Sequence, residues 1–323
     1  MPNELMSTSN ALAAQLRAEI EAAKKTLAAS HASATLKAYA TDWLDFCRFC
    51  EARQLPPLPA SPDIIILYLS NQKEAGKAPS TIERRMAAIN YHHKENGHRT
   101  PAADDIVGII PRMLRGIKNE TKRKIDKKAP ADAGVLLQML ETIQGEDLRA
   151  IRNRAILALG MASALRRSEL VALEVPHLHF SDKGLVIDIA SSKTDQEGSG
   201  QSVAVPEGTT IKPVEAMRTW LDAASISNGF AFRRLTRSGR VTDHPMNDRS
   251  IARLVKASAA AANLDPAKYS AHSLRAGFLT EAAANRASPF RMMDHARHKS
   301  LDTVAGYVRT AEQFDNHAGD DFL

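Results

Sequence analysis

The sequence predicts a mainly α-helical protein of two domains, with a small antiparallel β-hairpin or sheet in the second domain. The chain has 323 residues, which exceeds one typical domain and leaves room for two separate cores. Aromatic residues make up only 5% of it, while alanine, leucine, glutamate, lysine and arginine are frequent. Apolar residues recur at helical spacing in most of the chain, and strand-like runs are confined to 184–206.

The charge balance favours a polyanionic partner. Lysine and arginine outnumber aspartate and glutamate by 43 to 37, which gives a net charge of +6 and a sequence pI near 9.3. The start, MPNELMSTSNALAAQ, lacks the basic and apolar segments of a signal peptide, and the longest apolar run, IIIL at 64–67, is too short to span a bilayer. We therefore expect a cytoplasmic protein that has no membrane partner.

The cysteines favour neither zinc binding nor redox chemistry. Cys47 and Cys50 form the motif CRFC inside a helical pattern. The sequence offers no second cysteine pair for a zinc site and no preceding strand for a thioredoxin motif. We expect two thiols on one buried helix face.

Residues 10–118 predict helices alone. A partly exposed, alanine-rich helix over 11–30 precedes a helix over 33–52, whose apolar residues repeat at helical spacing. Those residues, expected in the core of the first domain, are Leu36, Tyr39, Trp43 and Phe46.

Capping residues predict where the next helices begin. Ser61 is the expected cap of a helix that has Pro62 in its first position. Ser80 and Glu83 form the expected capping box of the following helix. A fifth helix is expected over 104–120, where Pro111 could interrupt it.

Basic residues gather on one helix and in one linker. The helix over 80–96 has a density of basic side chains that fits a DNA groove, although a solvated helix face has the same composition. Residues 119–131, between domains expected at 1–118 and 132–323, form a basic linker that would lie across DNA phosphates or act as a soluble tether. The expected DNA-binding residues are Arg84, Arg85, Lys94, Lys122, Arg123, Lys124, Lys127 and Lys128.

The second half predicts helices interrupted by one hairpin. Helices at about 132–144 and 147–163 precede two candidate strands, GLVIDIA and QSVAVP, which flank the turn SSKTDQEGSG with Lys193. Helices return at about 211–225 and 247–263, and DPAKYSAHSLRAGF opens another.

Three cationic or imidazole side chains could bind an anion. His272 and Arg275 are three positions apart and share one helix face. If Ser270 caps that helix, both lie at the end where free backbone N–H groups favour a phosphate oxygen. Arg166 follows the apolar stretch GMASAL and needs a partner there, either an anion or Glu169.

Two further residues complete a candidate site for phosphoryl transfer. Lys193 at a hairpin tip suits a proton donor, and Tyr307 follows His298 by nine residues, across a short turn and a helix that could return the phenol to the same place. The HARH pair, His295 and His298, is the nearest approach to a metal-ligand set. We therefore expect no metal or other cofactor and assign charge neutralisation to cationic side chains.

These motifs resemble tyrosine recombinases of the phage integrase family. That family has, in order, an arginine in LRxSEL, a hairpin lysine, an HxxR box, a second histidine or tryptophan, and a tyrosine nine residues later. The likeness covers nearly the whole chain and is strongest from about 150 to 309, and the helical first half with its basic linker is a Cre-like layout. The matching residues are Arg166 in LRRSEL, Lys193, His272, Arg275, His298 and Tyr307.

The chain departs from the family pattern next to His298. Many members have Leu-Gly-His there, whereas this chain has ARH, with Arg297 in place of the glycine. His295 is a competing candidate, but its distance of twelve residues from the tyrosine fits less well. Arg167 competes with Arg166, and the register of LRRSEL favours Arg166.

The resemblance implies a site-specific DNA recombinase that forms a two-domain clamp on double-stranded DNA. It would cleave and rejoin strands through a 3′-phosphotyrosyl intermediate and a Holliday junction, without metal or ATP, as a homotetramer on two duplexes. The tail AEQFDNHAGDDFL would dock on a neighbouring protomer. The implied roles are phosphate binding by Arg166, Arg275 and His298, proton acceptance or relay by His272, general acid catalysis by Lys193, nucleophilic attack by Tyr307, and orientation of the arginine and histidine side chains by Glu169.

Other functions share part of this pattern. A type IB-like topoisomerase would have the same active site but would need no docking tail. A non-catalytic helical DNA-binding protein would share the charge and the helices, but it would not explain the spacing of Tyr307 from His298. A helical scaffold with an incidental basic face is the remaining alternative.

Overall fold

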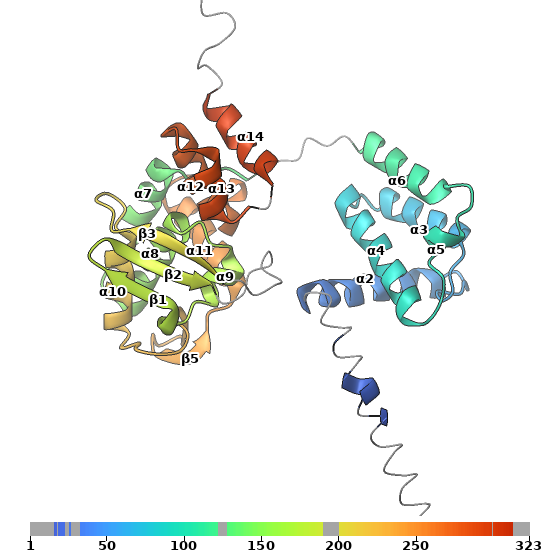
Figure 1. The fold of residues 1–323 in the computed structure, drawn as a ribbon, viewed down its shortest axis with the longest axis horizontal. Helices are drawn as coiled ribbons and strands as arrows, with labels where there is room; N and C mark the ends of the chain where they lie inside the picture. Colours follow the sequence, from blue (N-terminus) through green and yellow to red (C-terminus); the bar gives the residue numbers. More distant parts are fainter. Residues whose placement is uncertain are drawn as a thin grey trace, which may run out of the picture. The chain divides into compact units, whose positions relative to one another are not determined.

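The chain consists of two compact units, Met1–Ile125 and Asp126–Leu323, each with its own hydrophobic core (Figure 1). Both are mainly helical, and the second also contains small antiparallel sheets, which confirms the predicted fold class. Among the residues with described positions, no helix is long and apolar enough to cross a membrane. The structure, a computed structural model, describes residues 16–17, 19–22, 26, 33–121, 128–189, 200–298 and 300–312.

The described part of the first unit is a bundle of helices around an apolar core. Its helices are α2 (Ser33–Glu51), α3 (Pro62–Glu74), α4 (Pro79–Glu95), α5 (Pro101–Asp104) and α6 (Ile109–Glu120). Phe46 of α2 is fully buried, as predicted, and its ring contacts that of Tyr68 of α3 with centroids 5.0 Å apart. The other predicted core residues of α2, Leu36, Tyr39 and Trp43, are half-buried.

The remaining sequence predictions for α2 and the segment before it have mixed outcomes. Cys50 is buried and Cys47 is half-buried on α2, and both are free thiols. Most of the helix expected over 11–30 lies outside the described residues. Those of its residues that are described, such as 19–22, are helical.

The predicted N-cap of α4 is wrong by two residues. Pro79 occupies the first helical position and Ala78 is the N-cap, so Ser80 lies inside the helix and forms no capping box with Glu83. The fixed φ of proline suits the first helical position, where its missing N–H removes no hydrogen bond. This preference outweighed the capping preference of serine.

The predictions for the starts of two other helices in this unit are met only in part. Pro62 begins α3 as expected, but the Ser61 side chain makes no capping hydrogen bond. The fifth predicted helix begins later than expected, as α6 at Ile109, because its N-cap Gly108 adopts a left-handed conformation with φ of 66°. Pro111 lies in the first turn of α6, where proline is tolerated.

The second unit combines helices with short antiparallel strands. Strands β1 (Leu178–Ser181), β2 (Gly184–Ile189) and β3 (Gln201–Pro206) form one sheet in that order, and β4 (Arg233–Leu235) pairs with β5 (Val241–Pro245). β2 and β3 were predicted, whereas β1, β4 and β5 were missed because strands this short show little alternation. The helices are α7 (Ala133–Glu141), α8 (Leu148–Ala162), α9 (Arg167–Val171), α10 (Pro213–Ala223), α11 (Asp248–Ala261), α12 (Ala271–Ala284), α13 (Pro289–Ala296) and α14 (Leu301–Ala311).

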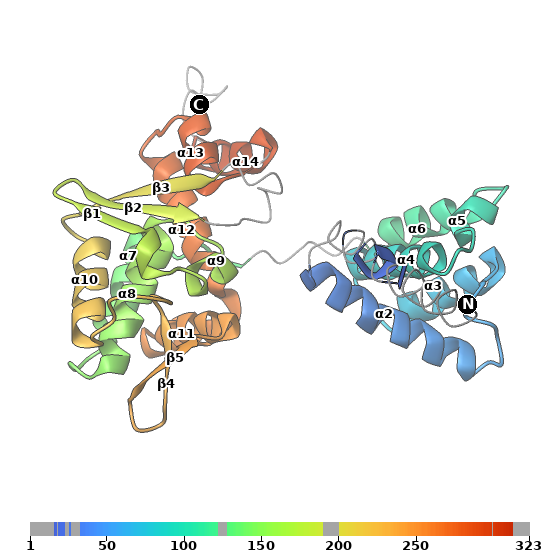
Figure 2. The same ribbon diagram turned by 60° about the horizontal axis from the view of Figure 1, so that its bottom comes forward.

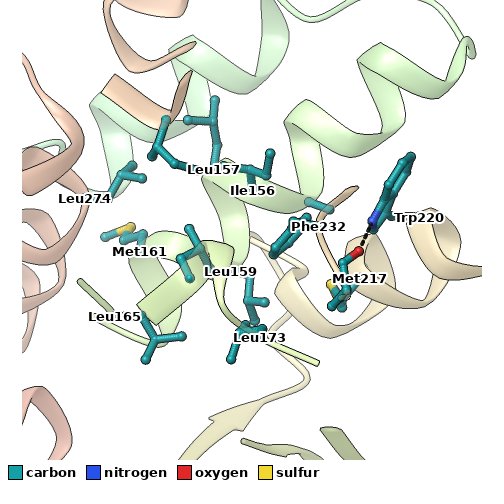
Figure 3. Packing of buried hydrophobic residues seen from close by; sticks show 14 of the residues in the cluster. Ile156, Leu157, Leu159, Met161, Leu165, Leu173, Met217, Trp220, Phe232 and Leu274 are labelled. Atoms are coloured by element: carbon teal, nitrogen blue, oxygen red, sulfur yellow. Dashed lines mark hydrogen bonds between the residues drawn. The ribbon is translucent and has the colours of Figure 1, made fainter. Parts of the chain in front are cut away.

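Helix α8 runs through the core of the second unit. Figure 3 shows Ile156 and Leu159 of α8 packed in one cluster with Phe232 and with Trp220 of α10. The buried Trp220 indole N–H donates a hydrogen bond of 2.8 Å to the carbonyl of Ala231. The core therefore fixes the C-terminal end of α8, from which the LRRSEL segment follows.

Two glycines allow α12 to pack closely on its neighbours. A Cβ on Gly277 of α12 would overlap the backbone carbonyl oxygen of Ala131. A Cβ on Gly160 of α8 would lie 2.9 Å from Cδ1 of Leu274 in α12. This close packing holds the HxxR turn of α12 in a fixed position against the core.

Helices α12, α13 and α14 share a separate small apolar cluster. Leu279 of α12, Met292 of α13 and Val304 of α14 are buried in it together with Ala164, and Tyr307 packs against it. Within the second unit, α13 and α14 lie at the end opposite the β4–β5 hairpin (Figure 2). The cluster brings the last predicted site residues next to α12.

Candidate active site

Arg166 and Glu169 lie at the start of α9. Arg166 is the N-cap residue, and its backbone N–H donates to Glu169 Oε2 at 2.8 Å. Its guanidinium Nη1 donates to Glu169 Oε1 at 2.7 Å. Burial alone would raise the pKa of Glu169, but the Arg166 N–H and two nearby guanidinium groups outweigh it and hold that pKa below its usual value.

Arg275 of α12 is the most deeply buried cation of the site, with only 2% of its surface exposed. Its Nη1 donates to the Ala164 carbonyl at 2.6 Å, and its Nη2 donates to the Ala296 carbonyl. Burial, and then the charges of Arg166 and Arg297, lower its pKa to about 10, so the group stays charged at neutral pH.

His272 lies one turn before Arg275, at the capped end of α12. The Ser270 side chain accepts a hydrogen bond of 3.3 Å from the His272 N–H. Desolvation, and then the charges of Arg275 and Arg166, lower the pKa of His272 below 6.5. The imidazole is therefore neutral at pH 7 and able to accept a proton.

His298 follows α13 and lies in the electrostatic field of the same cations. Its Nε2 is buried and has no hydrogen-bond partner among the described residues. Burial, and then Arg275 and Arg166, lower its pKa to about 4. A buried ring nitrogen without a partner, surrounded by positive charge, is suited to an incoming anion.

Tyr307 of α14 is half-buried beside this cluster. Burial raises the pKa of its phenol, and the charge of Arg275 acts in the opposite direction. The phenol is therefore close enough to Arg275, within one chain, for their charges to interact. Lys193, the remaining predicted site residue, lies outside the described residues.

The competing residues of the sequence analysis have other contacts. Arg167 points to α11, where its Nε is 3.1 Å from Asp248 Oδ2. The His295 ring stacks on Phe278 with centroids 4.2 Å apart, and its Nε2 is 3.0 Å from the Ala162 carbonyl oxygen. Within the described ranges, no three His, Cys, Asp or Glu side chains are grouped as they would be around a metal ion.

Arg297, which was predicted only as a replacement for glycine, belongs to the same cluster as Arg166 and Glu169. It is the C-cap of α13, in a left-handed conformation with φ of 53°. Its side chain is 3% exposed, and its Nη2 is 2.6 Å from Glu169 Oε2. The signal in the sequence was a charged residue at a position that favours glycine.

The predicted DNA-binding residues of the first unit differ in their contacts. Arg84 is exposed and pairs with Asp42 of α2. Arg85 is 13% exposed, with its Nη1 2.6 Å from Asp45 Oδ1. Lys94 is exposed.

The linker residues lie mostly outside the described part of the chain. This applies to Lys122, Arg123, Lys124 and Lys127. Lys128 is exposed, and its Nζ donates to the Ala267 carbonyl at 2.7 Å.

Comparison with known proteins gives two family matches. Residues 131–313 match the phage integrase family, and residues 24–98 match the N-terminal SAM-like domain of phage integrases. The chain is 36% identical to the integrase/recombinase xerD homolog of Selenomonas ruminantium over 301 residues, which cover 92% of this chain and 87% of the relative. It is 21% identical to recombinase cre of Escherichia phage P1, over 83% of each chain.

Solved structures show the same fold. XerH site-specific recombinase, in a post-cleavage complex with a palindromic difH substrate, aligns with a TM-score of 0.60 and 16% identity over 79% of this chain and 70% of that one. A lambda integrase dimer bound to a COC′ core site aligns with a TM-score of 0.58 and 15% identity over 90% and 94%. Since one family match spans more than half of the sequence and a 36% identical relative spans most of it, the chain belongs to the phage integrase family and is a site-specific tyrosine recombinase, an enzyme that breaks and rejoins DNA.

Proposed function

We propose that Tyr307 is the nucleophile of this recombinase and that Arg166, His272, Arg275 and His298 surround the phosphodiester it attacks. The observation that carries this proposal is the convergence of side chains separated by up to 141 positions in the sequence on one half-buried cluster. The cluster carries an excess of positive charge and includes the imidazole Nε2 of His298, which has no hydrogen-bond partner within the described part of the chain. An anion with several oxygens would complete it.

The arginines stabilise the charge that develops during the reaction. In the pentacoordinate transition state, negative charge builds on the non-bridging oxygens, which two guanidinium groups can bind with paired donors. Arg275 is held by two backbone carbonyls, so its position is set before DNA binds. His298, in the tautomer that carries its proton on Nε2, donates another hydrogen bond from that nitrogen.

Proton transfer accompanies both bond changes. The Tyr307 oxygen forms a bond to phosphorus, and its proton passes to the neutral His272 as base or relay. The bond from phosphorus to the deoxyribose 5′ oxygen breaks, and Lys193 donates a proton to that oxygen. The 3′-phosphotyrosyl link retains the energy of the broken bond, so a second 5′ hydroxyl reverses the step without ATP or a metal.

The partner of this chemistry is double-stranded DNA, held between two domains. We assign DNA binding to a first domain over 1–118 and a basic linker over 119–131, and catalysis to residues 132–323. Four protomers on two duplexes would exchange strands through a Holliday junction, with the tail over 311–323 docked on a neighbouring protomer. Such an enzyme works in the cytoplasm, where chromosomal and phage DNA are found in bacteria.

Covalent adduct formation tests the nucleophile. A target duplex would be selected from random-sequence DNA with the full-length protein. It would then be nicked a few nucleotides to the 3′ side of the cleaved phosphate, so that the short fragment with the free 5′ hydroxyl dissociates. We expect a denaturant-resistant adduct from the wild-type protein and from Tyr91→Phe, and none from Tyr307→Phe. An adduct from Tyr307→Phe would refute the assignment.

A second assay separates recombination from the topoisomerase alternative, which the comparisons do not favour. Two selected sites on one supercoiled plasmid would be incubated with the protein. Exchange between the sites is expected, whereas relaxation without exchange would favour the topoisomerase. A non-catalytic DNA-binding protein would give neither product.

A further inference from the structure

Arg297 combines two features that are each unfavourable. It adopts left-handed backbone angles, φ 53° and ψ 50°, which are strained for a residue with a Cβ and favour glycine at the end of a helix. Its guanidinium is also buried, with 3% of the side chain exposed. A charged side chain is seldom found in such a position unless its contacts compensate for both costs.

The contacts of Arg297 link it to Arg166 in two ways. Its Nη2 lies 2.6 Å from Glu169 Oε2, and the same carboxylate binds Arg166 through Oε1 at 2.7 Å. The backbone carbonyl of Arg297 also accepts a hydrogen bond from Arg166 Nη2 at 3.4 Å. One residue thus contacts Arg166 directly and through Glu169.

The turn that contains Arg297 also positions the rest of the cluster. The carbonyl of Ala296 accepts a hydrogen bond from Arg275, and His298 follows directly in the chain. The ion pair from Arg297 to Glu169 is therefore a clamp between this turn and α9. Loss of this ion pair would loosen the turn whose carbonyls accept hydrogen bonds from Arg166 and Arg275.

The charges of this cluster give Arg297 a second effect. Glu169 and Arg166 alone form a neutral pair, whereas Glu169 with both arginines carries a net charge of +1. A buried carboxylate shared by two guanidinium groups leaves more positive potential for a phosphate than a carboxylate paired with one.

We propose that Arg297 is a positioning residue of the active site, which engages Glu169 so that Arg166 keeps its orientation and its positive charge for the scissile phosphate. This inference rests on the proposed function of the cluster. In this role Arg297 makes no contact with DNA. We therefore expect substitution of Arg297 to lower the rate of cleavage without a matching loss of DNA affinity.

The test compares substitutions at two arginines that share one backbone conformation. Arg286 is also left-handed, with φ of 55°, but it is exposed at the far end of α12. Full-length Arg297→Met, Arg297→Gly, Arg297→Lys and the control Arg286→Met would be compared on the selected, nicked duplex. Three quantities would be measured: the dissociation constant, the single-turnover rate of adduct formation, and the thermal midpoint.

We expect Arg297→Met and Arg297→Gly to slow adduct formation by about 10- to 100-fold, the size of a small misplacement of catalytic groups, while the dissociation constant changes by less than about threefold. Arg297→Lys should restore part of the rate, because it returns the charge without the planar fork. Arg286→Met should cleave at the wild-type rate.

Wild-type cleavage by Arg297→Met or Arg297→Gly would overturn the inference, and so would equal losses in binding and cleavage. If Arg297→Met does not fold, Arg297→Gly decides, because glycine relieves the backbone strain. If neither folds, Arg297 serves the fold rather than the reaction, and the inference fails. Failure of the proposed function is distinct, since Tyr307→Phe would then form the adduct whatever residue 297 is.

Discussion

Each unit contains a cluster of arginine and carboxylate side chains, but the two clusters differ in charge balance. In the first unit, Arg84 and Arg85 of α4 face Asp42 and Asp45 of α2, so that two cations meet two anions. In the second unit, three arginines converge, and Glu169 is the carboxylate that pairs with two of them. The third, Arg275, donates to backbone carbonyls.

This difference separates a cluster whose charges are balanced within its own unit from one with an excess of positive charge, which is suited to bind an anion. In the first unit the arginine charges are already neutralised by α2, and the Tyr68 hydroxyl also donates to Asp45 at 2.8 Å. The excess charge of the second cluster has no such counterpart among the described residues. Arginines that look alike in the sequence can therefore differ in charge balance, because this depends on how many carboxylates they contact in the folded protein.

The largest expected effect is on the unbalanced cluster. Arg275→Ala and Arg166→Ala should each lower the rate of adduct formation by about 10³-fold or more, because they stabilise charge in the transition state, and should leave DNA affinity nearly unchanged. Arg167→Ala is the matched control, since its guanidinium faces Asp248. Equal losses in binding and cleavage would contradict this assignment.

The next largest effect is on the stability of the first unit, whose arginine and aspartate charges balance. Arg85→Met removes a guanidinium that is 13% exposed and binds Asp45 and Gln72, and should lower the free energy of unfolding of the first unit by about 3 kcal/mol. Arg84→Met removes an exposed partner of the buried Asp42, which keeps Arg85 at 3.7 Å, and should cost less, about 1 kcal/mol. Urea unfolding followed by Trp43 fluorescence in a Trp220→Phe background measures both. Equal values for the two variants would show that burial does not set the cost.

Desolvation and the positive charges around His272 also predict the pH profile of cleavage. Because the pKa of His272 is lowered from 6.5, its neutral, proton-accepting form persists as pH falls from 8 to about 6.5. The kcat/KM of cleavage should stay level over this range and decrease below it, by about tenfold per pH unit at most. An acid limb with its midpoint above 6.5 would rule out His272 as the base in this electrostatic setting.

The smallest expected effect is on the salt dependence of DNA binding. Neutralising Lys122, Lys124 and Lys127 of the linker should flatten the slope of log affinity against log salt by about one unit for each phosphate that the linker no longer binds. Arg85→Gln should leave the slope unchanged, because that charge is balanced by Asp42 and Asp45. A flattened slope for Arg85→Gln would mean that α4 gives up its internal ion pairs to bind DNA.

Local signals were sufficient for most helices and for part of the sheet. Pro62 marked the start of α3 and Ser270 that of α12, since both act on the neighbouring backbone. The strands β2 and β3 were predicted from their alternation, whereas β4 has only three residues and shows no pattern. Ser80 misled the prediction for α4, because a proline one residue earlier fits the helix start better.

The residues of the candidate site were selected from their order and spacing in the sequence, but their contacts were not predictable. The ion pair between Glu169 and Arg297 joins positions that are 128 residues apart. In the sequence, the pattern ARH showed only that Arg297 occupies a position where many family members have glycine. Likewise, the basic pattern of α4 did not reveal that Asp42 and Asp45 neutralise its arginines.

The sequence by itself determined the helical fold class, the family and the order of the residues with acidic, basic or nucleophilic chemistry, because each depends on residue type and local spacing. The tertiary structure alone decided which cations are neutralised and which remain in excess. Charge interactions depend on distance and burial rather than on sequence separation, so only the packing of α8, α9, α12, α13 and α14 gathers these separated basic residues into one cluster.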